Sequence, residues 1–159
     1  MKRIYLDHNA TTPLGQAARA AMRKWLDGAS SGMVHGNPSS VHVEGQHARA
    51  AVELARRQVA DAVGSELTEI VFTSGATEAN NLALRSLPHP VATTTVEHPS
   101  ILGSGVPLCQ IEVDSQGRLP NPDVIIAKAI EAGARSLSIM FANNETGNIY
   151  PVQAIAAAA

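Results

Sequence analysis

The sequence predicts an α/β fold in which helices flank a mostly parallel sheet, and three observations indicate it. Strand-like and helix-like segments alternate from Glu69 onward, as the βαβ units of a parallel sheet require. An amphipathic helix is predicted at Gln46–Val63. Three polar loops each follow a predicted strand, at the edge where such sheets bind ligands.

The first part of the chain predicts an extended arm and two helices. The opening IYLDHNATTP contains turn formers and too little alternation for a strand. Apolar residues at helical spacing predict a helix at Gln16–Leu26, which Gly28 would end. The Gly- and Ser-rich stretch 28–40 predicts a loop. The next helix, Gln46–Val63, is apolar on one face and charged on much of the other, and Gly64 would end it.

The second part of the chain predicts the sheet. The expected strands are Glu69–Thr73, Val91–Val96, Leu108–Val113 and Leu137–Ala142. The expected helices are Thr77–Leu87 and Pro122–Ala132. A further helix could start at Pro151. The final Ala156–Ala159 is either the start of that helix or a run of residues of unassigned identity. Without repeats or linkers, we expect an arm at 1–15 and one domain at 16–159.

Composition favours a soluble protein that binds a small molecule. Of 159 residues, 45% are hydrophobic and 16% charged, and no run reaches the roughly 18 apolar residues of a membrane span. The first residues lack the apolar region of a secretory signal, so a cytoplasmic location is expected. A net charge of −2 without a basic run argues against nucleic acid or an anionic membrane as partner. Cys109 is the only cysteine, which excludes an internal disulfide and argues against a metal site.

The segment TSGATEANN, Thr73–Asn81, places small residues at a strand-to-helix junction. Gly75 and Ala76 would let the backbone approach a ligand, and the N–H groups of the first helical turn favour an anion such as a phosphate. Local chemistry alone favours the alternative, in which Ser74 or Thr77 only caps the helix.

Two further polar segments directly follow predicted strands. His98, in VEHPSI, could stack on a flat ring or move a proton, although a lone histidine is more often an ordinary loop residue. Asn143, Asn144 and Glu145, in FANNETGN, could orient a polar ligand or simply form a turn. Because all three loops would meet at one sheet edge, they predict one pocket.

Taken in order, five motifs resemble the cysteine desulfurases, class V of the fold type I enzymes that use pyridoxal 5′-phosphate (PLP). They are YLDHNATTP, HGNPSSVH, EIVFTSGATEANNLAL, TTVEHPSIL and IMFANNETGNIYPV, and the resemblance runs from Ile4 to about Val152. It implies a three-layer α/β fold, of which this chain is the N-terminal portion of the PLP-binding large domain. Members of the family are homodimers.

The resemblance also implies roles for individual residues. Ala76 and Thr77 match the residues that hold the cofactor phosphate. His98 matches the histidine that stacks on the pyridine ring and is a proposed acid or base. Asn144 matches the asparagine that contacts the cofactor's phenolic oxygen and the substrate carboxylate. Secondary candidates near the substrate are Ala10, Thr11 and Asn37.

The implied reaction takes sulfur from L-cysteine, leaving alanine and a persulfide on a catalytic cysteine, for transfer to an acceptor protein and supply of iron–sulfur clusters or thio-cofactors. Lys2, Lys24 and Lys128 do not match the Schiff-base lysine, and the family's aspartate and arginine partners are missing as well. Cys109 lies in an apolar strand and does not match the persulfide carrier. Only Gly103–Val106 stands where the family has a full helix. We therefore expect an incomplete enzyme, inactive by itself.

Two alternatives stay open. The chain could be a non-catalytic scaffold or interaction module that keeps the PLP-site framework and associates with a complete homologue. It could instead derive from a selenocysteine lyase or another class V relative that acts on a different amino acid.

Overall fold

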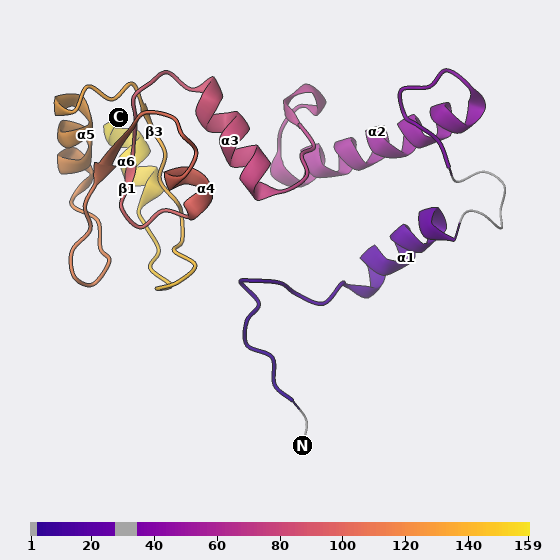
Figure 1. Cartoon of the computed structure of the whole chain (residues 1–159), viewed down its shortest axis with the longest axis horizontal. Helices are drawn as coiled ribbons and strands as arrows, with labels where there is room; N and C mark the ends of the chain where they lie inside the picture. Colours follow the sequence, from indigo (N-terminus) through magenta and orange to yellow (C-terminus); the bar gives the residue numbers. More distant parts are fainter. Residues whose placement is uncertain (1–2, 28–34) are drawn as a thin grey trace. The chain divides into compact units, whose positions relative to one another are not determined.

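The computed structural model describes residues 3–27 and 35–159 (Figure 1). These residues form two compact units, Met1–Phe72 and Thr73–Ala159. Lys2, Gly28 and the part of the predicted loop at 29–34 lie outside the described residues.

Among its described residues, the first unit contains the α-helices α1 (Gln16–Leu26) and α2 (Val43–Val63) and the short 3₁₀ helix η2 (Leu67–Glu69). The bounds of α1 agree with the prediction. Helix α2 begins three residues early because the His42 ring caps it by accepting the backbone N–H of Gly45. It ends, as predicted, at Gly64, whose φ of 70° is a left-handed conformation that favours glycine.

The predicted strand Glu69–Thr73 is wrong. Glu69 ends η2 instead, where its carboxylate accepts the backbone N–H of Glu66 in a capping box. The following residues, 70–72, form no regular element, because no strand among the described residues lies beside them to complete a ladder. Arg56 holds this segment by donating to the Ile70 carbonyl and by stacking 5.0 Å from the centre of the Phe72 ring.

The second unit is a parallel three-stranded sheet between two layers of helices. Its strands are β1 (Val91–Thr94), β2 (Leu108–Ile111) and β3 (Ser136–Leu137), in the order β2-β1-β3. Its helices are α3 (Ala76–Ser86), α4 (Pro99–Leu102), α5 (Pro122–Glu131) and α6 (Val152–Ala158). The predicted α/β class, parallel sheet and helical positions are confirmed, and α6 extends into the final alanine run. The four-residue α4 was not predicted, and it lies just before Gly103–Val106, the short stretch that stands where the family has a full helix.

Alternation along the central strand β1 builds the two sides of this unit. Ala92 packs in a core cluster with Ile125 of α5 and Ile155 of α6. The adjacent Val91 points to the opposite face, where it packs with Leu84 of α3 and Ile101 of α4. Helices α5 and α6 therefore cover one face of the sheet and α3 and α4 the other, which gives the three-layer arrangement (Figure 1).

Strand β3 is shorter than the predicted Leu137–Ala142, because side chains replace the ladder beyond Leu137. The backbone of Ser138 still donates to Ala92, but its carbonyl accepts the hydroxyl of Thr93. Two residues later, the backbone N–H of Met140 donates to the carboxylate of Glu97. The chain thus leaves the sheet early, and the loop that carries the candidate asparagines is tied to β1 by side chains.

Among the described residues, no helix is long and apolar enough to cross a membrane. The same part of the chain holds no group of three or more residues arranged to ligate a metal.

Candidate functional site

The N-terminus of α3 is open to an incoming anion. Gly75 precedes the helix, and no described side chain caps it, so neither Ser74 nor Thr77 is the cap that local chemistry favoured. The first intrahelical bond runs from Ala79 N to Gly75 O at 3.1 Å, so the N–H groups of the first turn keep their donors for a ligand. A Cβ placed on Gly75 would meet no described atom within 4 Å. Space and donors suited to a phosphate group therefore coincide here.

The carboxylate of Glu78, in the first turn of α3, is held by Ser74, which precedes the helix. Its carboxylate accepts the Ser74 hydroxyl at 2.5 Å and the Ser74 backbone N–H at 2.6 Å. Both bonds lower the pKa of Glu78, and the bond from the Ser74 hydroxyl has the larger effect. The negative charge on Glu78 is thus already bonded by Ser74, on the N-terminal side of the turn.

His98 follows β1 and stands immediately before α4, where it is exposed. Its Nδ1 lies 2.8 Å from the Oγ of Ser100 and accepts the backbone N–H of Ser100 at 3.1 Å. Asn80 of α3 donates to the same Ser100 Oγ at 2.8 Å. Hydrogen bonds therefore connect the helix that carries Ala76 and Thr77 to the loop that carries His98.

A second set of bonds connects the His98 loop to the loop after β3. Asn143 is 5% exposed and donates from Nδ2 to the Val96 carbonyl at 2.9 Å. Its Oδ1 accepts the backbone N–H groups of Glu145 and Thr146, both at 2.9 Å. Asn143 is thus a structural residue that shapes the turn, and the adjacent Asn144 is exposed and donates to the Glu145 carboxylate at 2.9 Å.

Glu97 is a buried carboxylate between these loops that the sequence did not single out. It is 7% exposed, and its Oε1 accepts the Met140 backbone N–H at 2.6 Å. Loss of solvent raises the pKa of Glu97, and bonds from the Met140 and His98 amides partly offset that rise. The sequence offered one signal for Glu97 as a candidate site residue: it directly follows an apolar strand and precedes His98.

The structure thus links three of the predicted segments at one end of the sheet. Ala76 and Thr77 on α3, His98 after β1 and Asn144 after β3 all belong to the second unit. Asn80 and Ser100 link the first pair to His98, and Glu97 and Asn143 link His98 to Asn144. Such a site can bind an anionic, planar, hydrogen-bonding ligand.

The secondary candidates Ala10, Thr11 and Asn37 belong to the first unit, and all three are exposed. The Thr11 carbonyl accepts the Tyr5 hydroxyl at 3.2 Å. Asn37 forms a turn in which its Oδ1 accepts the Ser39 backbone N–H at 2.9 Å. Their participation in the site stays a prediction.

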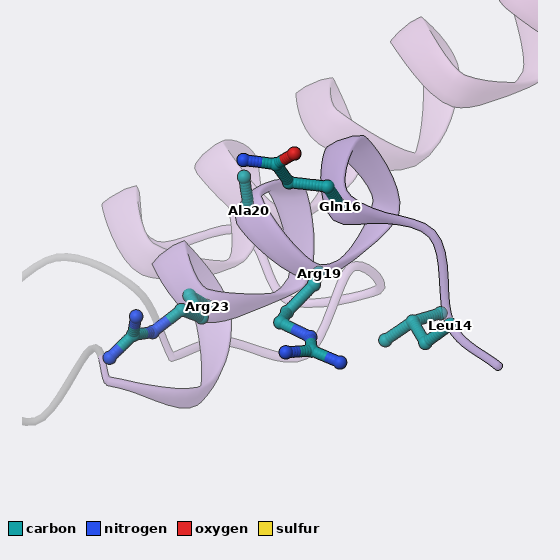
Figure 2. Close-up of a pocket in the computed structure, with 5 residues that line it drawn as sticks. All are labelled: Leu14, Gln16, Arg19, Ala20 and Arg23. Atoms are coloured by element: carbon teal, nitrogen blue, oxygen red, sulfur yellow. The ribbon is translucent and has the colours of Figure 1, made fainter. Parts of the chain in front are cut away.

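A hollow of about 520 Å³ lies on the first unit, and none of the predicted site residues lines it. It is lined by Leu14, Gln16, Arg19, Ala20 and Arg23, and Figure 2 shows the guanidinium groups of the two arginines extending away from the helix backbone. All five residues are exposed, and Arg23 already lies 3.5 Å from Asp27. We do not assign this hollow as the functional site, because exposed charges in water hold a ligand weakly.

Cys109 and Lys128 keep the positions that the sequence predicted. Cys109 lies in β2, half-buried, with its Sγ 3.5 Å from the Ala132 carbonyl. Lys128 is exposed on α5. Neither is joined to the loops of the site by a described hydrogen bond.

Known proteins resemble this chain over nearly its whole length. Residues 4–159 match the family model described as aminotransferase class-V. A cysteine desulfurase of Cereibacter sphaeroides is 39% identical over 98% of this chain and 42% of its own length. A solved NifS-like protein from Rickettsia africae is 30% identical, with a TM-score of 0.81 over 98% of this chain and 44% of its own.

A more distant solved structure shows the fold alone. It is a C-DES mutant with glycine covalently linked to its PLP cofactor, 18% identical, with a TM-score of 0.70 over 91% of this chain and 40% of its own. The chain spans about two fifths of the length of the curated relatives it matches.

Proposed function

This chain belongs to the class-V aminotransferase family, and we propose that it is the N-terminal part of a PLP-dependent cysteine desulfurase. The observation that carries the proposal is the open N-terminus of α3, joined by hydrogen bonds to the loops of His98 and Asn144. The names of the relatives and the motifs quoted above support the choice of cysteine as the substrate.

The residues present fit the cofactor. Ala76 and Thr77 would bind its phosphate with first-turn N–H groups and a hydroxyl, in the space that Gly75 leaves open. His98 would stack on the pyridine ring, and Asn144 would donate to the phenolic oxygen and the substrate carboxylate. When bound, PLP supplies the electron sink for the reaction, and the protein supplies binding and orientation.

The Schiff-base lysine, the persulfide cysteine and the substrate-binding arginine of a working enzyme would come from outside these 159 residues. None of Lys2, Lys24 and Lys128 has the sequence context of the Schiff-base lysine. We therefore propose that this chain alone binds PLP without a covalent link and without turnover.

The wider setting is proposed from the family resemblance. We infer a cytoplasmic homodimer, or association of this chain with a complete homologue, with Ala10, Thr11 and Asn37 close to the substrate. The sulfur would pass to an acceptor protein for iron–sulfur clusters or thio-cofactors.

Equilibrium dialysis of PLP against the full chain tests the proposal. We expect Thr77→Val to weaken PLP binding about tenfold, because it removes one hydrogen bond to a charged group. Thr77→Ser should restore affinity, and Thr68→Val, at an exposed threonine of η2, is the matched control. Equal affinity of wild type and Thr77→Val would refute the assignment of the phosphate site.

Borohydride reduction followed by intact-mass measurement tests the mode of binding. We expect the mass of the chain, 16.6 kDa, without a stoichiometric PLP adduct. A single lysine adduct at a defined position would contradict the proposed absence of a Schiff-base lysine.

A further inference from the structure

The hydrogen bonds at His98 determine which ring nitrogen carries the proton. The backbone N–H of Ser100 donates to Nδ1 at 3.1 Å. A backbone amide can only donate, so Nδ1 must present its lone pair. The single proton of the neutral imidazole therefore lies on the other nitrogen, Nε2.

The side chain of Ser100 strengthens this choice. Its Oγ lies 2.8 Å from the same Nδ1, and it accepts a hydrogen from Asn80 Nδ2 at 2.8 Å. Because Nδ1 has no hydrogen to give, the Ser100 hydroxyl must donate to it, and the amide of Asn80 orients that hydroxyl from the other side. The bonds thus run in one direction, from Asn80 through Ser100 to His98.

This chain of bonds is sheltered from water at its centre. Ser100 is 8% exposed, and it lies where α3 and α4 pack together. Water therefore competes poorly for its hydroxyl, and the direction of the bonds persists.

We propose that Ser100 and Asn80 are positioning residues that fix neutral His98 as the Nε2–H tautomer. His98 then presents a hydrogen-bond donor, and not a base, through the ring nitrogen that faces away from Ser100. The action of this donor on a cofactor or substrate rests on the proposed function, whereas the tautomer does not.

Long-range ¹H–¹⁵N correlation spectra of the full chain, with ¹⁵N-labelled histidine, measure the tautomer without any ligand. The chain has six histidines, and the signals lost in His98→Gln identify those of His98. We expect wild-type His98 to be mainly the Nε2–H form. A predominant Nδ1–H form would overturn the proposal.

Two variants test the positioning residues. Ser100→Ala removes one of the two donors to Nδ1 and should lower the ratio of Nε2–H to Nδ1–H about fivefold. Asn80→Asp should lower the ratio further, because the new carboxylate takes the Ser100 hydroxyl hydrogen and leaves its oxygen to accept from Nδ1–H. An unchanged ratio in either variant would overturn the direction of the bonds.

Two further variants separate positioning from general damage to the fold. Ser104→Ala removes another buried serine, 5% exposed, whose Oγ has no partner among the described residues, and should leave the ratio unchanged. Ser100→Thr keeps the hydroxyl and should keep the ratio. Failure to bind PLP with an intact Nε2–H tautomer would count against the proposed function alone.

Discussion

Replacement of Asn143 by alanine should destabilise the second unit by about 3 kcal/mol. The side chain is 5% exposed and makes three bonds of 2.9 Å, to the backbones of Val96, Glu145 and Thr146. A net contribution of about 1 kcal/mol for each bond gives the total. The lost bonds connect the loop after β1 to the loop after β3, so the second unit should lose stability while the first unit keeps its own.

Hydrogen exchange of the Val91 amide measures this loss directly. Val91 is fully buried in the central strand, and its N–H donates to Pro107 O at 3.0 Å, so its protection reports unfolding of the second unit. A loss of about 3 kcal/mol corresponds to a roughly 150-fold fall in protection. Asn144→Ala, at the exposed neighbour, should change stability by less than about 0.5 kcal/mol. Equal effects of the two variants would refute the structural role of Asn143.

Three further predictions concern other parts of the chain. Gly45→Ala should destabilise the first unit by more than about 1 kcal/mol in urea unfolding, because the new Cβ would lie 2.8 Å from the Asn37 carbonyl oxygen. The control Gly15→Ala has open space around it and should cost less than about 1 kcal/mol. Equal costs for the two variants would contradict the proposed crowding at Gly45. The raised pKa of Glu97 means that folding favours its protonated form, so its contribution to stability should fall as pH rises from the ordinary carboxyl pKa through the raised value. Glu97→Gln should remove that pH dependence, and parallel stability curves for the two proteins would show that burial does not act in this way. Ile125 is fully buried in the core cluster around Ala92. In denaturant unfolding, Ile125→Ala should lower the free energy of unfolding by about 3 kcal/mol and Ile125→Val by about 1 kcal/mol. A smaller loss for alanine than for valine would be inconsistent with a packed core.

The helices could be predicted because their signals are local. Helix α1 has the predicted bounds, and α3 begins and ends within one residue of its prediction. Gly64 ends α2 through a conformation that depends only on its own backbone. Each of these features can be inferred from a few adjacent residues.

The strands were less predictable because a strand requires a neighbour. Residues 69–73 have strand-like composition, yet the Glu66–Glu69 capping box and the lack of an adjacent strand among the described residues decide their conformation. Strand β3 ends after Leu137 because Thr93 and Glu97 take over the bonds that a longer ladder would have made. Both outcomes depend on residues distant in sequence.

The site was predictable in position but not in its supporting bonds. His98 and Asn144 could be singled out because each directly follows an apolar strand, and parallel strands bring such loops together. Ser100 and Asn80 could not, because their importance arises from partners in other segments. Glu97 also directly follows the apolar strand and was missed, because its bond to the distant Met140 amide cannot be inferred from the sequence. For Asn143 and Asn144, composition alone could not decide which was buried and structural.

The two apolar clusters of the second unit have a consequence for folding during synthesis. The cluster around Val91 draws its buried members from residues 84–101, so it can form soon after this stretch leaves the ribosome. The cluster around Ala92 needs Ile155 of α6 and stays incomplete until that helix has been made. One face of the same strand is therefore protected early, while the other is exposed to chaperones or aggregation for tens of residues of further elongation.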